Sequence, residues 1–350
     1  MKKERSRSSE ASFAWATGPR SLRYSDSSEL GIERVRKGRG FSYRNPNGSP
    51  VRDRETRARI RALAIPPAWT QVWIATDAAA HLQATGRDAK GRKQYRYHPA
   101  YRAHRDQKKF DHLAELGAAL PLLRRQIRAG LALRGISRER VLAALVYLLD
   151  TTFARVGNHE YERTNGSFGL TTLHSRHARR AGKELRLSFR GKSGIAHELS
   201  VGDPRVVRII RRCQELPGQA LFQYLEESGE RSVIDAGDVN AWIREGAKSE
   251  QITAKDFRTW HGSVLAFEAL KRLPSPESAA EGQRALNEVV DQIAARLGNT
   301  RAVCRRYYVH SGLVDAFLDG TLAAAVAKMP ARRRRDLSVT ESQLLAWLKP

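Results

Sequence analysis

Cysteines and long apolar runs are scarce in this sequence, and each shortage excludes a class of protein. Only Cys213 and Cys304 occur in 350 residues, and neither has the C-x-x-C spacing of a metal site or a pattern typical of disulfide scaffolds. No apolar run is long enough to predict a membrane span, and the apolar patch at 12–16 is too short for the core of a signal sequence. We therefore expect a cytoplasmic protein without a membrane anchor, and a basic, disordered tail over residues 1–20.

Nucleotide and metal motifs are missing as well. The sequence has no glycine-rich Walker loop, no H-E-x-x-H and no paired carboxylates at metal-binding spacing. It therefore gives no support to ATP hydrolysis or to a two-metal mechanism, and we expect neither a cofactor nor a metal ion. Any chemistry on phosphate then falls to arginine, lysine and tyrosine.

Positive charge is abundant. Lys and Arg number 62 against 37 Asp and Glu, which gives a formal net charge of +25. A surplus of this size favours a polyanionic partner, and nucleic acid is the first candidate. The length of the chain predicts two domains.

Residues 21–104 carry strand and turn signals. A turn cluster lies at 45–48, a short apolar strand is predicted at 72–75, and residues 81–98 predict a β-hairpin whose turn is at 88–91. Since side chains alternate along a strand, one face of 92–98 carries Lys93, Tyr95 and Tyr97 and the other carries Arg92, Gln94 and Arg96. We predict a β-rich N-terminal domain.

Residues 105–350 have mainly helical periodicity. One predicted helix starts at a Ser137 cap and ends at Gly157, and another runs from Ser275 to Gly298. Segments 168–173, 185–189 and 195–201 predict a small three-stranded sheet, with 191–194 as a hairpin tip. The expected fold is α+β, with a β-rich domain followed by a larger, mainly helical one that contains this sheet.

The chain contains, in order, G-R-K-Q-Y-R-Y-H at 91–98, R-V-G-N at 155–158, R-G-K-S-G at 190–194, K-D-F-R-T-W at 255–260, and L-G-N-T at 297–300 followed by R-R-Y-Y at 305–308. Each motif alone is weak. Together, and in this order, they resemble the small poxviral and bacterial type IB topoisomerases, over nearly the whole chain after the tail.

The resemblance implies a role for each matching residue. Tyr308 would be the nucleophile, and Arg155 and Arg258 would clamp the phosphate oxygens. Lys192 would be the general acid. The chemistry agrees, because guanidinium groups offer forked donors matched to phosphate, whereas a lysine gives up a proton to a developing alkoxide. Lys192 at a glycine-flanked tip is expected to become ordered on DNA.

Asn299 stands where part of this family has histidine. It lies nine residues before Tyr308, as the motif requires, and its amide can donate a hydrogen bond to a phosphate oxygen. The alternative is that Asn299 and Thr300 form only a capped turn between two helices. Tyr307 lies about 100° from Tyr308 on a helix, so only one of them can face the phosphate, and the motif spacing selects Tyr308.

The resemblance also nominates DNA-contacting residues. Gln94, Tyr95 and Tyr97 would lie on the hairpin strand, and Asn158 and Tyr161 follow Arg155. Amide and phenol groups read base edges or bind phosphates. Because Gln94 points away from the two tyrosines, contact by all three requires a twisted or edge-on strand.

The implied activity is relaxation of supercoiled duplex DNA through a 3′-phosphotyrosyl intermediate, by a monomeric clamp associated with the nucleoid. Two alternatives stay open. A tyrosine recombinase has the same tyrosine chemistry, but such enzymes usually carry H-x-x-R at the second catalytic arginine, where this chain has Lys255. A non-enzymatic DNA-binding protein would keep the basic surface without turnover, and the intact catalytic set argues against it.

Overall fold

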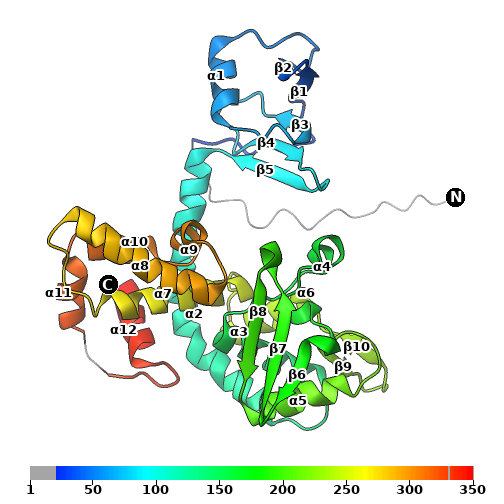
Figure 1. Ribbon diagram of the computed structural model, residues 1–350, viewed down its shortest axis with the longest axis vertical. Coiled ribbons are helices and arrows are strands. Elements are labelled where there is room, and N and C mark those ends of the chain that lie inside the picture. The colour runs from blue at the N-terminus through cyan, green and yellow to red at the C-terminus, as the bar shows by residue number, and fades with distance from the viewer. Residues whose placement is uncertain (1–20, 330–331, 350) are drawn as a thin grey trace. The chain divides into compact units, whose positions relative to one another are not determined.

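The computed structural model describes residues 21–329 and 332–349 (Figure 1). The chain divides into two compact units, Met1–Lys109 and Phe110–Pro350. The predicted boundary near residue 104 falls within α2 (Pro99–Ala132), the helix that also contains the division between the units. The predicted tail over residues 1–20 lies outside the described residues.

The N-terminal unit contains an antiparallel five-stranded sheet in the order β2-β1-β3-β4-β5. The strands are β1 (Ile32–Lys37), β2 (Gly40–Arg44), β3 (Thr70–Ile74), β4 (Leu82–Arg87) and β5 (Lys93–Tyr97). The predicted hairpin is confirmed, because β4 and β5 pair across a turn closed by Asp88, whose side chain accepts hydrogen bonds from the backbone N–H groups of Lys90 and Arg92 at 2.9 and 3.0 Å.

One helix of this unit was not predicted. α1 (Arg54–Ala62) starts at the Asp53 cap, whose carboxylate accepts a hydrogen bond from the Thr56 N–H at 2.6 Å. Ile60 is its buried residue and packs into a small core with the sheet. A single buried apolar side chain among charged ones makes no apolar stripe of helical period, and therefore the sequence pattern does not predict α1.

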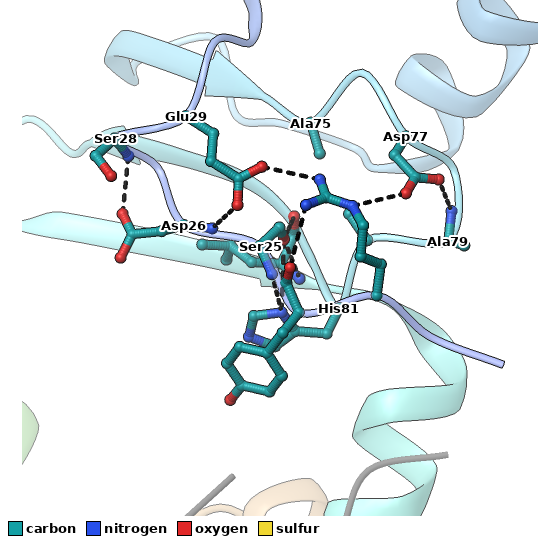
Figure 2. A network of polar contacts seen from close by, with 12 residues as sticks. Ser25, Asp26, Ser28, Glu29, Ala75, Asp77, Ala79 and His81 are labelled. Carbon is teal, nitrogen blue, oxygen red and sulfur yellow. Dashed lines mark hydrogen bonds and ion pairs between the residues drawn. The ribbon is translucent and has the colours of Figure 1, made fainter. Parts of the chain in front are cut away.

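The segment before β1 is fastened to the sheet by polar contacts (Figure 2). Arg23 donates hydrogen bonds to Glu29 and Asp77, both at 2.9 Å, and Figure 2 shows these two carboxylates facing each other across the network. The Ser25 N–H donates to Nδ1 of the buried His81 at 3.1 Å, and the Tyr24 ring stacks on His81 with centroids 3.8 Å apart. These contacts hold the segment before β1, which has no regular secondary structure, against the sheet.

The C-terminal unit is mainly helical, and the predicted fold class is confirmed. Its large core includes the fully buried rings of Phe222, Phe257, Trp260 and Phe267. After α2, the helices are α3 (Arg138–Thr152), α4 (His159–Asn165), α5 (Pro204–Gln214), α6 (Ala236–Ala247), α7 (Ala254–Leu270), α8 (Ala279–Leu297), α9 (Arg301–Tyr307), α10 (Ser311–Leu318), α11 (Thr321–Ala327) and α12 (Val339–Leu348). None of the helices in the described ranges is long and apolar enough to cross a membrane.

The small sheet has the order β6-β7-β8, with β6 (Ala178–Ala181), β7 (Glu184–Arg190) and β8 (Ala196–Val201), and α3 and α5 lie against it (Figure 1). The prediction that 168–173 supplies its third strand is wrong. Residues 170–172 form a buried 3-10 turn, in which Thr171 and Thr172 bind backbone carbonyls. A second, two-stranded sheet pairs β9 (Gln223–Leu225) with β10 (Arg231–Val233).

Two predicted helix boundaries are wrong by several residues. α3 ends at Thr152 and not at Gly157, because Phe153 adopts the left-handed conformation (φ 60°) that ends a helix as a glycine would. α8 takes Ser278 as its cap, and not Ser275, since the Ser278 hydroxyl accepts a hydrogen bond from a backbone N–H of the first turn.

Arg124 on α2 joins several elements of the C-terminal unit. It donates to the Asp150 carboxylate on α3 at 2.8 and 3.0 Å, and to both oxygens of Glu341 on α12 at 3.0 and 2.7 Å. A fifth bond goes to the Asp336 carbonyl at 2.7 Å. The Trp260 indole on α7 also donates to Glu341, at 3.2 Å. This buried cluster fixes α12, the last helix of the chain's described part, to α2, α3 and α7.

Candidate active site

Arg155 lies in a short loop after α3, and not in the last turn of a helix that continues to Gly157, as the sequence predicted. Its carbonyl accepts a hydrogen bond from the Leu170 N–H at 2.9 Å, and the Val156 carbonyl accepts one from the Thr171 N–H at 2.7 Å. These bonds fasten the loop to the buried 3-10 turn. The Arg155 guanidinium donates to Oδ1 of Asn299 at 2.7 Å, although 144 residues separate the two in sequence.

Arg258 is on α7 and is 3% exposed. It donates to the carbonyl of Phe153 and, at 2.6 Å, to that of Leu297. Within the described ranges, its Nε has no hydrogen-bond partner although it is buried. Burial lowers the pKa of Arg258 and the nearby charge of Arg155 lowers it further, so the two guanidinium groups form a concentrated positive site.

Tyr308 caps the end of α9, and the residue is 9% exposed. The guanidinium carbon of Arg258 lies 4.9 Å from the ring centroid. Burial raises the pKa of the Tyr308 phenol, but the charges and hydrogen bonds of Arg258 and Arg155 outweigh it and hold this pKa below its usual range. The phenol oxygen is therefore easier to deprotonate than that of a free tyrosine, as a nucleophile requires.

The backbone of Tyr308 is also held firmly. Its N–H donates to the Cys304 carbonyl at 2.9 Å, and its carbonyl accepts a hydrogen bond from the Ser263 hydroxyl at 3.3 Å. Gly262 on α7 allows this approach, because a β-carbon there would lie 2.3 Å from the Tyr308 carbonyl oxygen. The neighbouring Tyr307 ring lies under the Arg306 guanidinium at 5.3 Å.

Asn299 links the two arginines. Its oxygen accepts the bond from Arg155, and its amide donates to the Leu297 carbonyl at 3.2 Å, the same carbonyl that accepts from Arg258. The helix cap of α9 is Thr300, whose hydroxyl accepts a hydrogen bond from a backbone N–H at 3.4 Å. Asn299 and Thr300 thus form a capped turn between α8 and α9, and a contact of Asn299 with phosphate stays a prediction.

Lys192 is exposed in a 3-10 turn (Lys192–Gly194) between β7 and β8. Ser193 and Gly194 both have positive φ, 65° and 75°, so the turn is tight. Within the described part of the chain, Lys192 makes no hydrogen bond or ion pair. The structure therefore brings together Arg155, Arg258, Asn299 and Tyr308, and leaves Lys192 outside their network of contacts.

The candidate DNA-contacting residues lie in two places. On β5, Tyr95 is 46% exposed and its ring stacks on that of the half-buried Tyr97 at 6.1 Å. Gln94 donates to Asp88 at 3.0 Å. In the C-terminal unit, the Asn158 oxygen caps α4, and Tyr161 on that helix is 53% exposed. The exposed tyrosines are available to a ligand, whereas Gln94 and Asn158 already have structural bonds.

Sequence reasoning missed the carbonyl acceptors that hold Arg258. Phe153 presents its carbonyl through a left-handed backbone, and its ring is flanked by His261 at 4.8 Å and by the Arg296 guanidinium at 5.5 Å. No local sequence pattern predicts that Phe153 has this backbone conformation or that its carbonyl binds Arg258. A phenylalanine at the end of an apolar stripe indicates only a continuing helix.

Comparison with known proteins agrees with this geometry. Residues 98–320 match the family model of the eukaryotic DNA topoisomerase I catalytic core, and residues 40–88 match that of the bacterial DNA topoisomerase IB N-terminal domain. A DNA topoisomerase 1B of Acanthamoeba polyphaga mimivirus is 30% identical over 294 residues, which cover 82% of this chain and 87% of the relative. DNA topoisomerase 1B of vaccinia virus (strain Copenhagen) is 23% identical over 273 residues, 74% of this chain and 79% of the relative.

The match to the catalytic core covers more than half of the chain, and the core contains the clustered tyrosine and arginines. The class of protein is thus a DNA topoisomerase, and DNA is its substrate. With the mimiviral relative and the matching N-terminal domain, the chain belongs to the type IB DNA topoisomerase family.

Proposed function

We propose that this protein relaxes supercoiled duplex DNA with Tyr308 as its nucleophile, without ATP or metal. The observation that carries the proposal is the Tyr308 phenol, buried beside Arg258 and Arg155 with its pKa lowered by them. The phenol releases its proton to water, and its oxygen attacks the scissile phosphorus. A bond forms between tyrosine and the 3′-phosphate, and the bond to the 5′-oxygen breaks. Rotation of the free end then relaxes the duplex, and attack by the 5′-hydroxyl restores the strand and frees the tyrosine.

The other residues divide the work of this step. Arg155 and Arg258 neutralise the charge that builds on the non-bridging oxygens, and the rigid contacts of Arg258 with two carbonyls support that role. Asn299 donates to a phosphate oxygen with its remaining N–H. Lys192 gives its proton to the departing 5′-oxygen, for which an exposed turn without fixed partners leaves it free to move.

DNA binding uses both units of one chain. Gln94, Tyr95 and Tyr97 contact the duplex from the hairpin, and Asn158 and Tyr161 contact it beside Arg155; the exposure of Tyr95 and Tyr161 supports this assignment. The protein acts as a monomeric clamp on nucleoid DNA in the cytoplasm, where a reducing environment suits its two free, buried cysteines. Light scattering with and without a short duplex tests the monomer.

Relaxation of supercoiled plasmid in EDTA without ATP tests the activity, and the Tyr308→Phe variant tests the nucleophile. Removing the phenol oxygen abolishes both relaxation and the covalent complex but leaves DNA binding nearly intact. Tyr307→Phe is the matched control, and it relaxes plasmid as the natural protein does. Covalent complex trapped with Tyr308→Phe would refute the assignment.

The role of Lys192 is tested with a substrate in which sulfur replaces the bridging 5′-oxygen. A thiolate leaves without a proton donor, so cleavage by Lys192→Ala recovers on the sulfur substrate. Arg258→Ala stays slow, because its loss affects the non-bridging oxygens. General acid catalysis contributes about 10² to 10⁴ in rate, and most of that loss is expected to vanish with sulfur.

A further inference from the structure

His197 on β8 lies between the two turns that carry candidate catalytic residues. A β-carbon on Gly191 would lie 2.5 Å from His197 Cδ2, and one on Gly298 would lie 2.6 Å from Cε1. The two ring carbons on either side of Nε2 therefore contact the residue before Lys192 and the residue before Asn299. Both neighbours are glycines, and any side chain at either position would collide with the ring.

The ring is fixed from the side of the sheet. His197 pairs with Phe189 across β7 and β8, and the two rings stack with centroids 5.3 Å apart. Just beyond this pair, the Gly191 N–H donates to the Ile195 carbonyl at 2.8 Å and closes the base of the turn. His197 thus lies at the base of the turn that carries Lys192.

The imidazole is half-buried and adds no charge to the site. Burial lowers the pKa of His197, and the charges of Arg155 and Arg258 lower it further, so the ring is neutral at neutral pH. A neutral, flat ring fills the space between the turns without a third cation beside two arginines. The His197 ring therefore acts through its size and flat shape, and not through charge.

We propose that His197 is a positioning residue that holds the Lys192 turn against the Gly298–Asn299 turn, so that the acid reaches the phosphate held by the arginines. The inference rests on the function proposed above for Lys192. Asn299 is fixed independently, since its N–H donates to the Ala294 carbonyl at 2.9 Å and its side chain bonds to Arg155. Loss of the His197 ring therefore allows the Lys192 turn to move, whereas the Gly298–Asn299 turn keeps its position.

The test is single-turnover cleavage of an oxygen and a bridging-sulfur substrate by the full chain carrying His197→Ala. With oxygen, we expect a loss of roughly 10- to 100-fold, part of the contribution of a general acid. With sulfur, the rate returns to near that of the natural protein, as for Lys192→Ala. His197→Phe keeps a flat ring of similar size, and its cleavage of the oxygen substrate stays close to normal.

His177→Ala is the matched control, because His177 is also half-buried and also packs on a phenylalanine, Phe168, at 4.6 Å. It cleaves both substrates at nearly the natural rate. Melting temperature and DNA affinity are measured for every variant. If His197→Ala does not fold, His197→Phe decides the matter.

Two results overturn the inference alone. One is that sulfur rescues Lys192→Ala but leaves His197→Ala slow, and the other is that a folded His197→Phe is as slow as Lys192→Ala on oxygen. If sulfur fails to rescue Lys192→Ala itself, the proposed acid is wrong and the positioning role falls with it. The Lys192→Ala measurement thus distinguishes a wrong assignment of the general acid from a wrong assignment of the positioning residue.

Discussion

Replacement of Arg124 by methionine tests how the buried ionic cluster stabilises the C-terminal unit. Arg124 uses its five donors on Asp150, Glu341 and the Asp336 carbonyl. The two carboxylate side chains are each 8% exposed. Arg124→Met leaves both of them buried without their cation, and water cannot replace the lost bonds.

The size of the effect follows from this burial. Removing one partner of a buried ion pair costs about 3 to 5 kcal/mol, and two stranded carboxylates place Arg124→Met at the upper end. In a unit of this size each kcal/mol lowers Tm by roughly 2 to 4 °C, so we expect a fall of about 10 to 20 °C. Neutralising all three groups in Arg124→Met/Asp150→Asn/Glu341→Gln removes the stranded charges, and this variant is more stable than Arg124→Met alone.

Urea unfolding followed by tryptophan fluorescence measures the free energy of each variant at pH 7. Arg124→Lys is the graded control, because three donors on a point charge replace only part of the fork and give an intermediate loss. An unfolding free energy of Arg124→Met within about 1 kcal/mol of that of the natural protein, the scale of a surface pair, would refute a stabilising role of the buried cluster. A triple variant that is the least stable of the set would refute that role as well.

Four further predictions concern binding, catalysis and pH. DNA affinity falls with a log–log salt slope of roughly −4 or steeper, and a nearly flat salt titration would contradict the phosphate contacts. Asn299→Ala loses about 10² to 10³ in cleavage rate on oxygen and sulfur substrates alike, and a natural rate would leave Asn299 as a turn residue only. Arg258→Gln raises the pKa of Tyr308, so its cleavage rate levels off at higher pH than that of the natural protein; an unchanged pH profile would count against the arginine. Burial opposes ionisation of Asp150, but His261 and Arg124 lower the pKa of its carboxyl to about 2. The lowered pKa stabilises the folded state by about 2 kcal/mol above pH 4, and this contribution is lost as pH falls through 2. Measuring the free energy of unfolding as a function of pH in the acid range checks this prediction.

Elements with a regular period could be predicted from the sequence. Alternation through Leu185, Leu187 and Phe189 places these side chains on the buried face of β7, and the same reasoning found the β4–β5 hairpin. The apolar run at 168–173 misled, because a short run of this kind fits a strand and a buried turn equally well. β6 reads Ala-Arg-Arg-Ala and has no alternation to detect.

The site shows a different limit. The motif spacing singled out Tyr308, and the structure places its ring beside Arg258. The bond between Arg155 and Asn299 and the two carbonyls that hold Arg258 join segments far apart in sequence, and no local pattern encodes them. Phe153 is the clearest case, since its left-handed backbone is set by contacts from other helices and not by its own preference.

The anchoring of the Tyr308 backbone has a mechanical consequence. On the proposed mechanism, the phosphotyrosyl bond would join the 3′ end of the cut strand to Tyr308 while the strand is open, so any load on that bond would fall on the backbone of this residue. α9 has only seven residues and would unravel under such tension if it carried the tyrosine alone. The hydroxyl of Ser263 and the close approach at Gly262 pass the force to α7, a helix of 17 residues with a buried centre, and this same helix carries Arg258. A displacement of Tyr308 would therefore move Arg258 with it, and on the proposed mechanism the two would stay aligned until the strand is rejoined.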